Sequence, residues 1–510
     1  MKSKFIPILI ICLLLLTGCS SQTETTTAAE DGSPELEYTS LSELSEVKRF
    51  ALCTGTIYGD IVEEMYPQAE IQYYPGAVDC ALAVAKNKAD ATLYDAPILQ
   101  YIADSTTGVG VMPDYLMKDN YHFCTGKTER GEWFKKEFDE WLAVQKQNGE
   151  IDRLYDFWCS NKEPEQIFDF STLPETNGKI IIATSGGSRP DVYYYKNTFS
   201  GFPIELIYEF CQDKGLGGEV VVASDNVLAQ LATGKVDVSL YFTSYTEERA
   251  ESMLFTDPVL ESGIGVMVRS DEKNTNSIWT IIKTGVTKTF IKEDRWKLLA
   301  SGLETAIIIS IGGFLLANIL GAIFCYCAMS RRKWLRSLAG AYNRIMQGTP
   351  MVVILMILYY VIFGNSDISG IWIAIIAFGL TTGATLAQQF YVAVTNVDKG
   401  QTEAGLAIGF TNLQTFIGIV MPQAVRMALP GYFIEFITLI KGTSIVGYIS
   451  IVDLTRAGDL IRSSTYDAFF PLLSVAFVYF LISFALLCLL KYFQKKLAPK
   501  RYVANKEETK

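Results

Sequence analysis

The chain has 510 residues, of which 49% are hydrophobic and 19% charged, and its mean hydropathy is +0.21. This composition excludes a disordered chain and disfavours an entirely soluble one, at a length typical of about three domains. The formal charge of −11 is uneven, because residues 291–510 contain 20 Lys and Arg against 12 Asp and Glu. The acidic first half excludes nucleic acid as a partner. With His122 as the single histidine and no clustered cysteines, we predict no metal site, no cofactor and no catalytic residue.

The N-terminus has the pattern of an export signal. Two lysines in Met1–Lys4 precede an apolar run, Phe5–Leu16, which is short for a membrane span but typical of a signal peptide. The run ends in Leu-Thr-Gly-Cys, which resembles a bacterial lipobox and implies that Cys19 is acylated. We therefore predict a lipoprotein-type signal peptide at 1–19 and a flexible tether at 20–43. An uncleaved anchor is the alternative.

Residues 44–269 alternate between predicted strands and helices, as in an α/β fold. Residues 50–53 and 89–94 are short apolar segments typical of buried strands. Residues 133–147 are predicted to be helical, with Phe134, Phe138, Trp141 and Leu142 on one side. The alternation predicts one solute-binding domain at 44–269.

The order of motifs in this domain resembles a family 3 periplasmic amino-acid-binding protein that has been circularly permuted. The motifs similar to the second half of that family come first, at 54–56, 88–95 and 149–158. Those similar to its first half follow, at 179–184, 201–206, 233–238 and 246–263. The resemblance implies a two-lobed type II α/β fold, with a distal lobe at about 44–120 and a second lobe at about 130–269. Two half-copies without a shared cleft are the alternative.

The same resemblance predicts the ligand-binding residues. An α-amino acid needs a cation for its carboxylate and an anion for its ammonium group. Arg249 is similar to the family's carboxylate-binding arginine, and Ser244 to its hydroxyl partner. Asp95 is similar to the ammonium-binding aspartate, and Gly55 and Thr56 are similar to donors of the distal lobe. Ordinary surface charges are the alternative for Arg249 and Asp95.

One loop departs from the family pattern. Where the family usually carries an aromatic residue over the ligand, this chain has the segment Ser188–Val192. We predict that Ser188 and Asp191 contact the ligand, and that recognition of a zwitterion is retained while the side-chain pocket is altered. Exposed loop charges are an equally weighted alternative for Arg189 and Asp191.

After a linker at 270–294, five apolar segments predict a membrane domain at 295–495. They are 300–327, 348–364, 370–393, 432–452 and 468–491. Basic clusters follow the first and the last segment, so an extracytoplasmic binding domain would put both clusters in the cytoplasm. The predicted protein is therefore a multi-pass protein of the bacterial cytoplasmic membrane, with a cytoplasmic tail at 496–510.

A loop between the third and fourth segments resembles the EAA loop of ABC importer permeases. It contains Glu403, Ala404, Gly405, Gly409, Ile419 and Pro422 at the spacing of that motif, with Gly405 in place of an alanine. In the family this loop docks on the ATPase. Together with flanking motifs, it resembles the polar-amino-acid permease subfamily over nearly all of 295–495.

These resemblances predict the substrate-binding and translocating subunit of an ABC importer for an amino acid. A separate ATPase is implied, because Gly126-Lys127-Thr128 has Tyr121 where a P-loop needs glycine. The other implied partners are an amino-acid ligand, the lipid bilayer and a second permease copy in a homodimer. The main alternative is a ligand-sensing receptor or channel; an enzyme on the same fold is a third class.

Overall fold

The computed structural model describes most of the chain after residue 34. Residues Leu36–Lys510 group as one compact unit. The described residues are 35–160, 166–184, 189–196, 198–223, 227–271, 278–364, 366, 368–467 and 469–497. The predicted signal peptide and Cys19 lie outside these residues.

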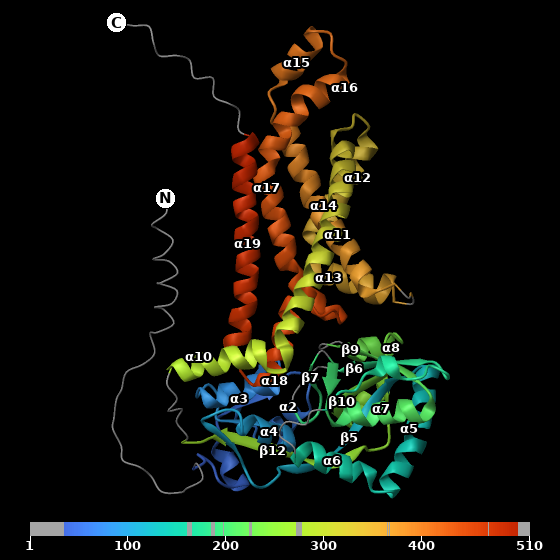
Figure 1. Ribbon diagram of the computed structural model, residues 1–510, viewed down its shortest axis with the longest axis vertical. Helices are drawn as coiled ribbons and strands as arrows, with labels where there is room; N and C mark the ends of the chain where they lie inside the picture. Colours follow the sequence, from blue (N-terminus) through green and yellow to red (C-terminus); the bar gives the residue numbers. More distant parts are fainter. Residues whose placement is uncertain are drawn as a thin grey trace. The chain divides into compact units, whose positions relative to one another are not determined.

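The first part of the unit is an α/β domain with a ten-stranded main sheet and a separate two-stranded sheet at residues 193–200 (Figure 1). The strands are β1 (Arg49–Cys53), β2 (Glu70–Tyr74), β3 (Ala91–Asp95), β4 (Val109–Val111), β5 (Met117–Gly126), β6 (Lys179–Thr184), β7 (Tyr193–Tyr195), β8 (Thr198–Ser200), β9 (Gly217–Val222), β10 (Val238–Ser244), β11 (Met253–Phe255) and β12 (Leu260–Arg269). The helices are α2 (Tyr58–Met65), α3 (Ala77–Ala85), α4 (Ala96–Ala103), α5 (Glu129–Gln147), α6 (Glu150–Ser160), α7 (Phe202–Lys214), α8 (Val227–Ala232) and α9 (Glu247–Ser252).

The sheet divides into two lobes with the same strand order. In the first lobe β2, β1 and β3 are parallel, and β12 and then β4 follow in antiparallel pairing. In the second lobe β9, β6 and β10 are parallel, and β5 and then β11 follow in antiparallel pairing. The two lobes are thus equivalent in topology.

The strands β5 and β12 cross between the lobes. β12 pairs with β3 through residues 264–268, and with the start of β5 through residues 260–264. β5 then continues into the second lobe, where it pairs with β10 and β11. Each lobe is therefore completed by a strand that comes from the other half of the domain sequence.

The observed boundaries differ in detail from those predicted. Residues 264–269 belong to the sheet of the first lobe, although the prediction assigned them to the second. The predicted tether ends sooner, because Leu36 bridges to Ser270 and the Glu37 carboxylate pairs with Arg269 at 2.5 Å. The predicted linker 270–294 is largely helical, with α10 at Ile278–Val286.

The second lobe has an aromatic core that the sequence partly predicted. Phe134, Phe138, Trp141 and Leu142 are the large buried side chains of α5, as the helical spacing indicated. The three aromatic rings among them pack against Phe210 of α7, with ring-centroid distances of 5.3–5.7 Å. Buried rings of this kind contribute about 0.5–1.5 kcal/mol per pair beyond their area.

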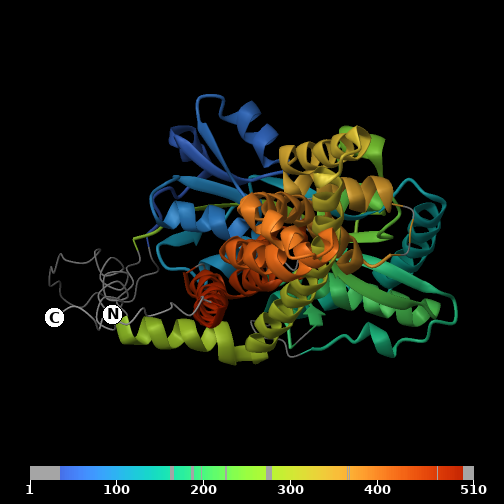
Figure 2. The ribbon, with the colours of Figure 1, turned by 90° about the horizontal axis from the view of Figure 1, so that it is seen from above.

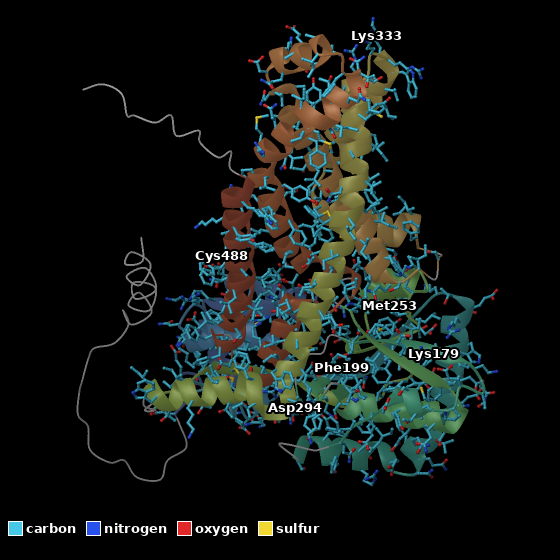
Figure 3. All side chains as sticks on the ribbon, turned by 45° about the horizontal axis from the view of Figure 1, so that its top comes forward. Lys179, Phe199, Met253, Asp294, Lys333 and Cys488 are labelled. Atoms are coloured by element: carbon cyan, nitrogen blue, oxygen red, sulfur yellow. The ribbon has the colours of Figure 1, made fainter. Side chains whose placement is uncertain are left out.

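The second part of the unit is helical. Its helices are α10 (Ile278–Val286), α11 (Arg295–Met329), α12 (Lys333–Gly348), α13 (Met351–Met356), α14 (Gly370–Thr395), α15 (Lys399–Ala407), α16 (Asn412–Thr415), α17 (Met421–Gly442), α18 (Leu454–Thr465) and α19 (Phe469–Leu497). Among the described residues, four helices are long and apolar enough to cross a membrane, or five if one bent pair counts as a span. The long helix α11 ends near the labelled Asp294 on one side and Lys333 on the other (Figure 3).

The second predicted segment, 348–364, corresponds to the second helix of the bent pair. Residues 333–348 and 351–362 meet at 103°, because Pro350 interrupts the helix between them. The fourth span begins earlier than predicted, since α17 starts at Met421. The helix α18 was not predicted, and its 12 residues are too few to cross a bilayer.

The helices α11 and α14 pack closely through small residues. A Cβ on Gly313 would lie 3.0 Å from Phe378 Cβ, and one on Gly321 would lie 2.9 Å from Leu386 Cβ. Glycine at these positions lets the two backbones approach, as is common where apolar helices associate in lipid. Seen end-on, α14 and α17 lie side by side (Figure 2).

The helix α18 contacts both lobes of the α/β domain. The guanidinium of Arg462 pairs with the Asp79 carboxylate of the first lobe. The Tyr466 hydroxyl, directly after α18, accepts a hydrogen bond from the Arg189 backbone N–H of the second lobe at 3.0 Å. One helix of the membrane domain therefore touches both halves of the α/β domain.

Candidate functional site

Arg249 links the two lobes of the α/β domain. It lies in the first turn of α9, where its backbone N–H donates to the N-cap hydroxyl of Thr246 at 3.2 Å. Its Nη2 donates to the Gly55 carbonyl at 2.8 Å, and its Nη1 to the Ser244 carbonyl at 3.2 Å. Gly55, with a φ of +78°, follows β1 in the first lobe. The structure thus brings together three of the predicted site residues.

Asp95 is the buried carboxylate at the end of β3, and it is 8% exposed. Its Oδ1 accepts hydrogen bonds from the Tyr58 hydroxyl at 2.8 Å and from the Tyr121 hydroxyl at 2.6 Å. Burial raises the pKa of Asp95 to about 6, although the two hydrogen bonds act in the opposite direction. The carboxyl group is therefore set to change its charge near neutral pH.

Tyr58 and Tyr121 were missed by the sequence analysis. Tyr58 stands three residues after Gly55, so its closeness to a predicted ligand-binding loop was a usable signal. Tyr121 is brought to Asp95 only by the crossing of β5, which no local pattern indicated.

Asp191 belongs to the loop that was predicted to alter specificity. Within the described part of the chain, its carboxylate forms no hydrogen bond or ion pair. Burial raises the pKa of Asp191 well above its usual range, and the nearby charge of Asp95 raises it further. Two carboxylates from different lobes thus lie close enough to repel each other, and a cation between them would relieve that repulsion.

The predicted hydroxyl donors, Ser244 and Thr56, form hydrogen bonds with other groups of the protein. Ser244 donates to the Asp119 carboxylate, and the Thr56 hydroxyl donates to the Cys53 carbonyl at 2.8 Å. Asp119 and Tyr121 lie on the same face of β5, so the Arg249–Ser244 and Asp95 groups are neighbours. Ser188 lies outside the described residues.

The predicted docking loop forms a compact knob of residues 399–420, made of α15, α16 and the π-helical turn 416–420 (Figure 1). Gly409, with a φ of +91°, makes the turn between the two helices. The following helix is capped by Thr411 and Gln414, whose side chains exchange hydrogen bonds with each other's backbone. Glu403 and Ala404 are exposed on α15, and Ile419 and Pro422 lie in and just after the turn 416–420.

The structure explains why glycine replaces alanine in this motif. Gly405 is the buried residue of α15, and a Cβ there would lie 2.6 Å from Thr415 Cγ2 and 2.9 Å from Ile419 Cδ1. The knob also exposes large apolar side chains, with Ile408 at 68% and Leu413 at 66% exposed. Such a patch on a small polar knob is typical of a protein-binding surface.

A model of the family described as binding-protein-dependent transport system inner membrane component matches residues 317–499. The L-cystine transport system permease protein TcyB of Bacillus subtilis (strain 168) is 31% identical over 224 residues, which cover 44% of this chain and 95% of that relative. The chain belongs to this permease family. Membership confirms the predicted multi-pass membrane protein, a transporter subunit rather than an ATPase, and implies a separate ATPase partner.

Two further proteins are similar to the permease domain. The putative glutamine transport system permease protein GlnP of Rickettsia conorii (strain ATCC VR-613 / Malish 7) is 28% identical over 204 residues, covering 39% of this chain and 92% of the relative. A crystal structure of an amino acid ABC transporter with histidines covers 44% of this chain and 100% of its own, with 27% identity and a TM-score of 0.38.

A putative L-cystine ABC transporter from Listeria monocytogenes covers 48% of this permease and 94% of its own chain, with 11% identity and a TM-score of 0.24. The structure of the permease itself has the predicted fold class, a two-lobed α/β domain followed by a helical membrane domain.

Proposed function

We propose that this permease is the combined ligand-binding and translocating subunit of an ABC importer for an amino acid. The observation that carries the proposal is the contact of Arg249 with Gly55 across two lobes, in the same chain as a permease domain. A receptor fused to its translocator delivers ligand without a diffusible binding protein. That the named relatives are permeases for L-cystine and glutamine supports an amino acid as the substrate class.

The chemistry of the site suits a zwitterion. In the ligand-bound state, the Arg249 guanidinium would exchange its carbonyl partners for the ligand carboxylate, which is a stronger, charge-assisted partner. The Asp95 carboxylate, with Asp191 beside it, would receive the ammonium group. The two ends of the ligand would then join the lobes, because Asp95 and Arg249 belong to different lobes.

The knob is the proposed contact with the ATPase. Its exposed apolar side chains and Glu403 offer a surface that a separate subunit can cover. The helix α17 starts directly after the knob and extends over 22 residues, or roughly 33 Å. A 3-10 segment, residues 443–449, and a short turn then connect α17 to α18, which touches both lobes. Ligand binding and ATP hydrolysis would therefore act on opposite ends of one continuous segment, residues 421–465. A second copy of the permease would complete the translocation path as a homodimer.

A ligand-gated receptor or channel is the competing function, and the exposed knob counts against it because a channel needs no ATPase dock. The test is ATP hydrolysis by the full-length permease and its ATPase subunit in nanodiscs, after a thermal-shift screen for the stabilising amino acid. A ligand at 100 times its Kd stabilises a protein by about 2.7 kcal/mol. We expect that amino acid to stimulate hydrolysis severalfold. Hydrolysis that is unaffected by every stabilising ligand would contradict the proposal.

A further inference from the structure

The segment that leads into the first span exposes many apolar side chains. In α10, Ile278 is 66% and Trp279 is 79% exposed, and Ile281, Ile282 and Val286 are also exposed. At helical spacing these residues share one side of α10, whereas Thr280, Lys283 and Thr284 lie on the other. Ile291 at 65% and Trp296 at 52% exposure continue the apolar surface to α11.

This segment lies across the direction of the spans. Figures 1 and 2 both show α10 along its length, whereas α14 and α17 are seen along their length in Figure 1 and end-on in Figure 2. A short amphipathic helix that carries tryptophan and adjoins a membrane span has the composition of an interfacial helix.

A basic cavity of about 110 Å³ adjoins the same segment. Its lining includes Arg189 of the second lobe, Lys288, Lys292, Glu293 and Arg295 of the segment, and the end of α18 at 464–466. It shares no residue with the Arg249–Asp95 site. The described lining holds four basic side chains and one acidic one, so its charge is +3.

Two arginines in the cavity share one carboxylate. Glu293 Oε1 accepts from Arg189 Nη2 at 2.9 Å, and Glu293 Oε2 accepts from Arg295 Nη2 at 2.7 Å. The side chains of all three are at most 6% exposed. In the described lining of the cavity, cationic side chains thus outnumber anionic ones, and cationic side chains are the usual hydrogen-bond donors to a phosphate group. The half-buried Lys288 and Lys292 are two of these cationic side chains.

We propose that residues 278–297 lie in the membrane interface and that the adjoining cavity binds the phosphate group of an anionic phospholipid. The apolar side of α10 then enters the acyl region, while the basic side chains that line the cavity meet the phosphate group. Because the cavity is lined by both lobes, by the end of α18 and by residues 288–295, the bound headgroup holds the α/β domain at the membrane surface. This role is separate from ligand transport.

Native mass spectrometry of the full-length permease with dioctanoyl phosphatidylglycerol tests the headgroup site. The variant Lys288→Gln/Lys292→Gln removes two half-exposed lysines of the cavity, and the control Lys283→Gln/Lys297→Gln makes the same charge change on the same segment outside it. We expect about tenfold weaker lipid binding in the first variant and less than a twofold change in the control. Equal binding by both variants would overturn the site. Equal retention of dioctanoyl phosphatidylcholine, or full competition by inorganic phosphate at the lipid's concentration, would overturn the anionic lipid as the occupant.

The interfacial position is tested independently in nanodiscs that contain brominated phosphatidylglycerol. Bromine quenches tryptophan fluorescence at close range, so quenching should fall in Trp279→Phe and stay unchanged in Trp133→Phe, a variant in the α/β domain. Because Trp279 is exposed on the protein surface, the substitution leaves the fold intact. The same quenching in wild type and Trp279→Phe would contradict the interfacial position.

Discussion

At the scale of single residues, the sequence analysis named Arg249, Ser244 and Asp95 as candidates but did not name the two tyrosines that contact Asp95. The resemblance to a family predicted Arg249, Gly55 and Ser244 together, and in the structure Arg249 contacts the other two. Local spacing in the sequence would not have related these three residues. The partners of Asp95 are different, since Tyr121 reaches it only through the crossing of β5. The spacing of residues along the sequence does not predict contacts that depend on the order of strands in a sheet.

Arg249→Ala should weaken binding of the amino acid by two to three decades. The ligand carboxylate would lose its cation, and removing one partner of a buried charge pair costs about 3–5 kcal/mol, at about 1.4 kcal/mol per tenfold. Isothermal titration of the full-length permease in detergent measures this loss. The control Arg153→Ala removes an exposed arginine that pairs with Glu150 on α6. Unchanged affinity in Arg249→Ala would exclude Arg249 from the site.

Ligand affinity should fall as the pH is lowered through about 6. The pKa of Asp95 is raised to about 6, so its carboxyl group is neutral below that pH and no longer attracts an ammonium group.

The same pKa shift of Asp95 means that the ligand-free protein loses stability as the pH rises from about 4 to 6, because ionising a buried carboxyl group is unfavourable.

Asp95→Asn should therefore bind the amino acid weakly at every pH and lack the step near pH 6. Its amide oxygen can still accept the two tyrosine hydrogen bonds, so the variant should fold. Asp60→Asn, an exposed carboxylate on α2, is the control. A pH profile that is the same in Asp95→Asn and wild type would contradict the role of Asp95.

At the scale of elements, the spacing of apolar residues predicted which side of a helix is buried. The apolar side of α5 was read correctly because a 3.6-residue period survives in any amphipathic helix. The bend after α12 and the helix α18 were not predicted as such. A hydropathy pattern reports length and polarity, whereas the path of a bent or short helix depends on its neighbours, here the two lobes that α18 touches.

The knob gives the element-scale prediction. Gly409→Val forces a β-branched residue to a φ of +91°, a strain of about 1–3 kcal/mol that would displace α15 from α16. We expect ligand binding to remain and ligand-stimulated ATP hydrolysis to fall at least tenfold in the complex. Gly418→Val is the control, because a Cβ there also meets open space but its φ is not positive. Full stimulation in Gly409→Val would argue against the knob as the ATPase dock.

At the scale of the whole molecule, the exchange of β5 and β12 supports one binding unit over two half-copies. Each lobe is completed by a strand from the other half, so neither half contains all the strands of its own sheet. We therefore expect one ligand per chain in titration of the full-length permease. Two ligands per chain, with Arg249→Ala removing only one of them, would favour the half-copies.

The central claim is that receptor and translocator are one chain, and uptake into proteoliposomes tests it most directly. The vesicles would contain only this permease and its ATPase subunit, with ATP supplied on the ATPase side and the radiolabelled amino acid on the other. The account predicts ATP-dependent accumulation without any added binding protein, reduced at least a hundredfold at limiting ligand in Arg249→Ala and unchanged in Arg153→Ala. Uptake that requires a separate soluble binding protein, or that is equal in the two variants, would contradict it.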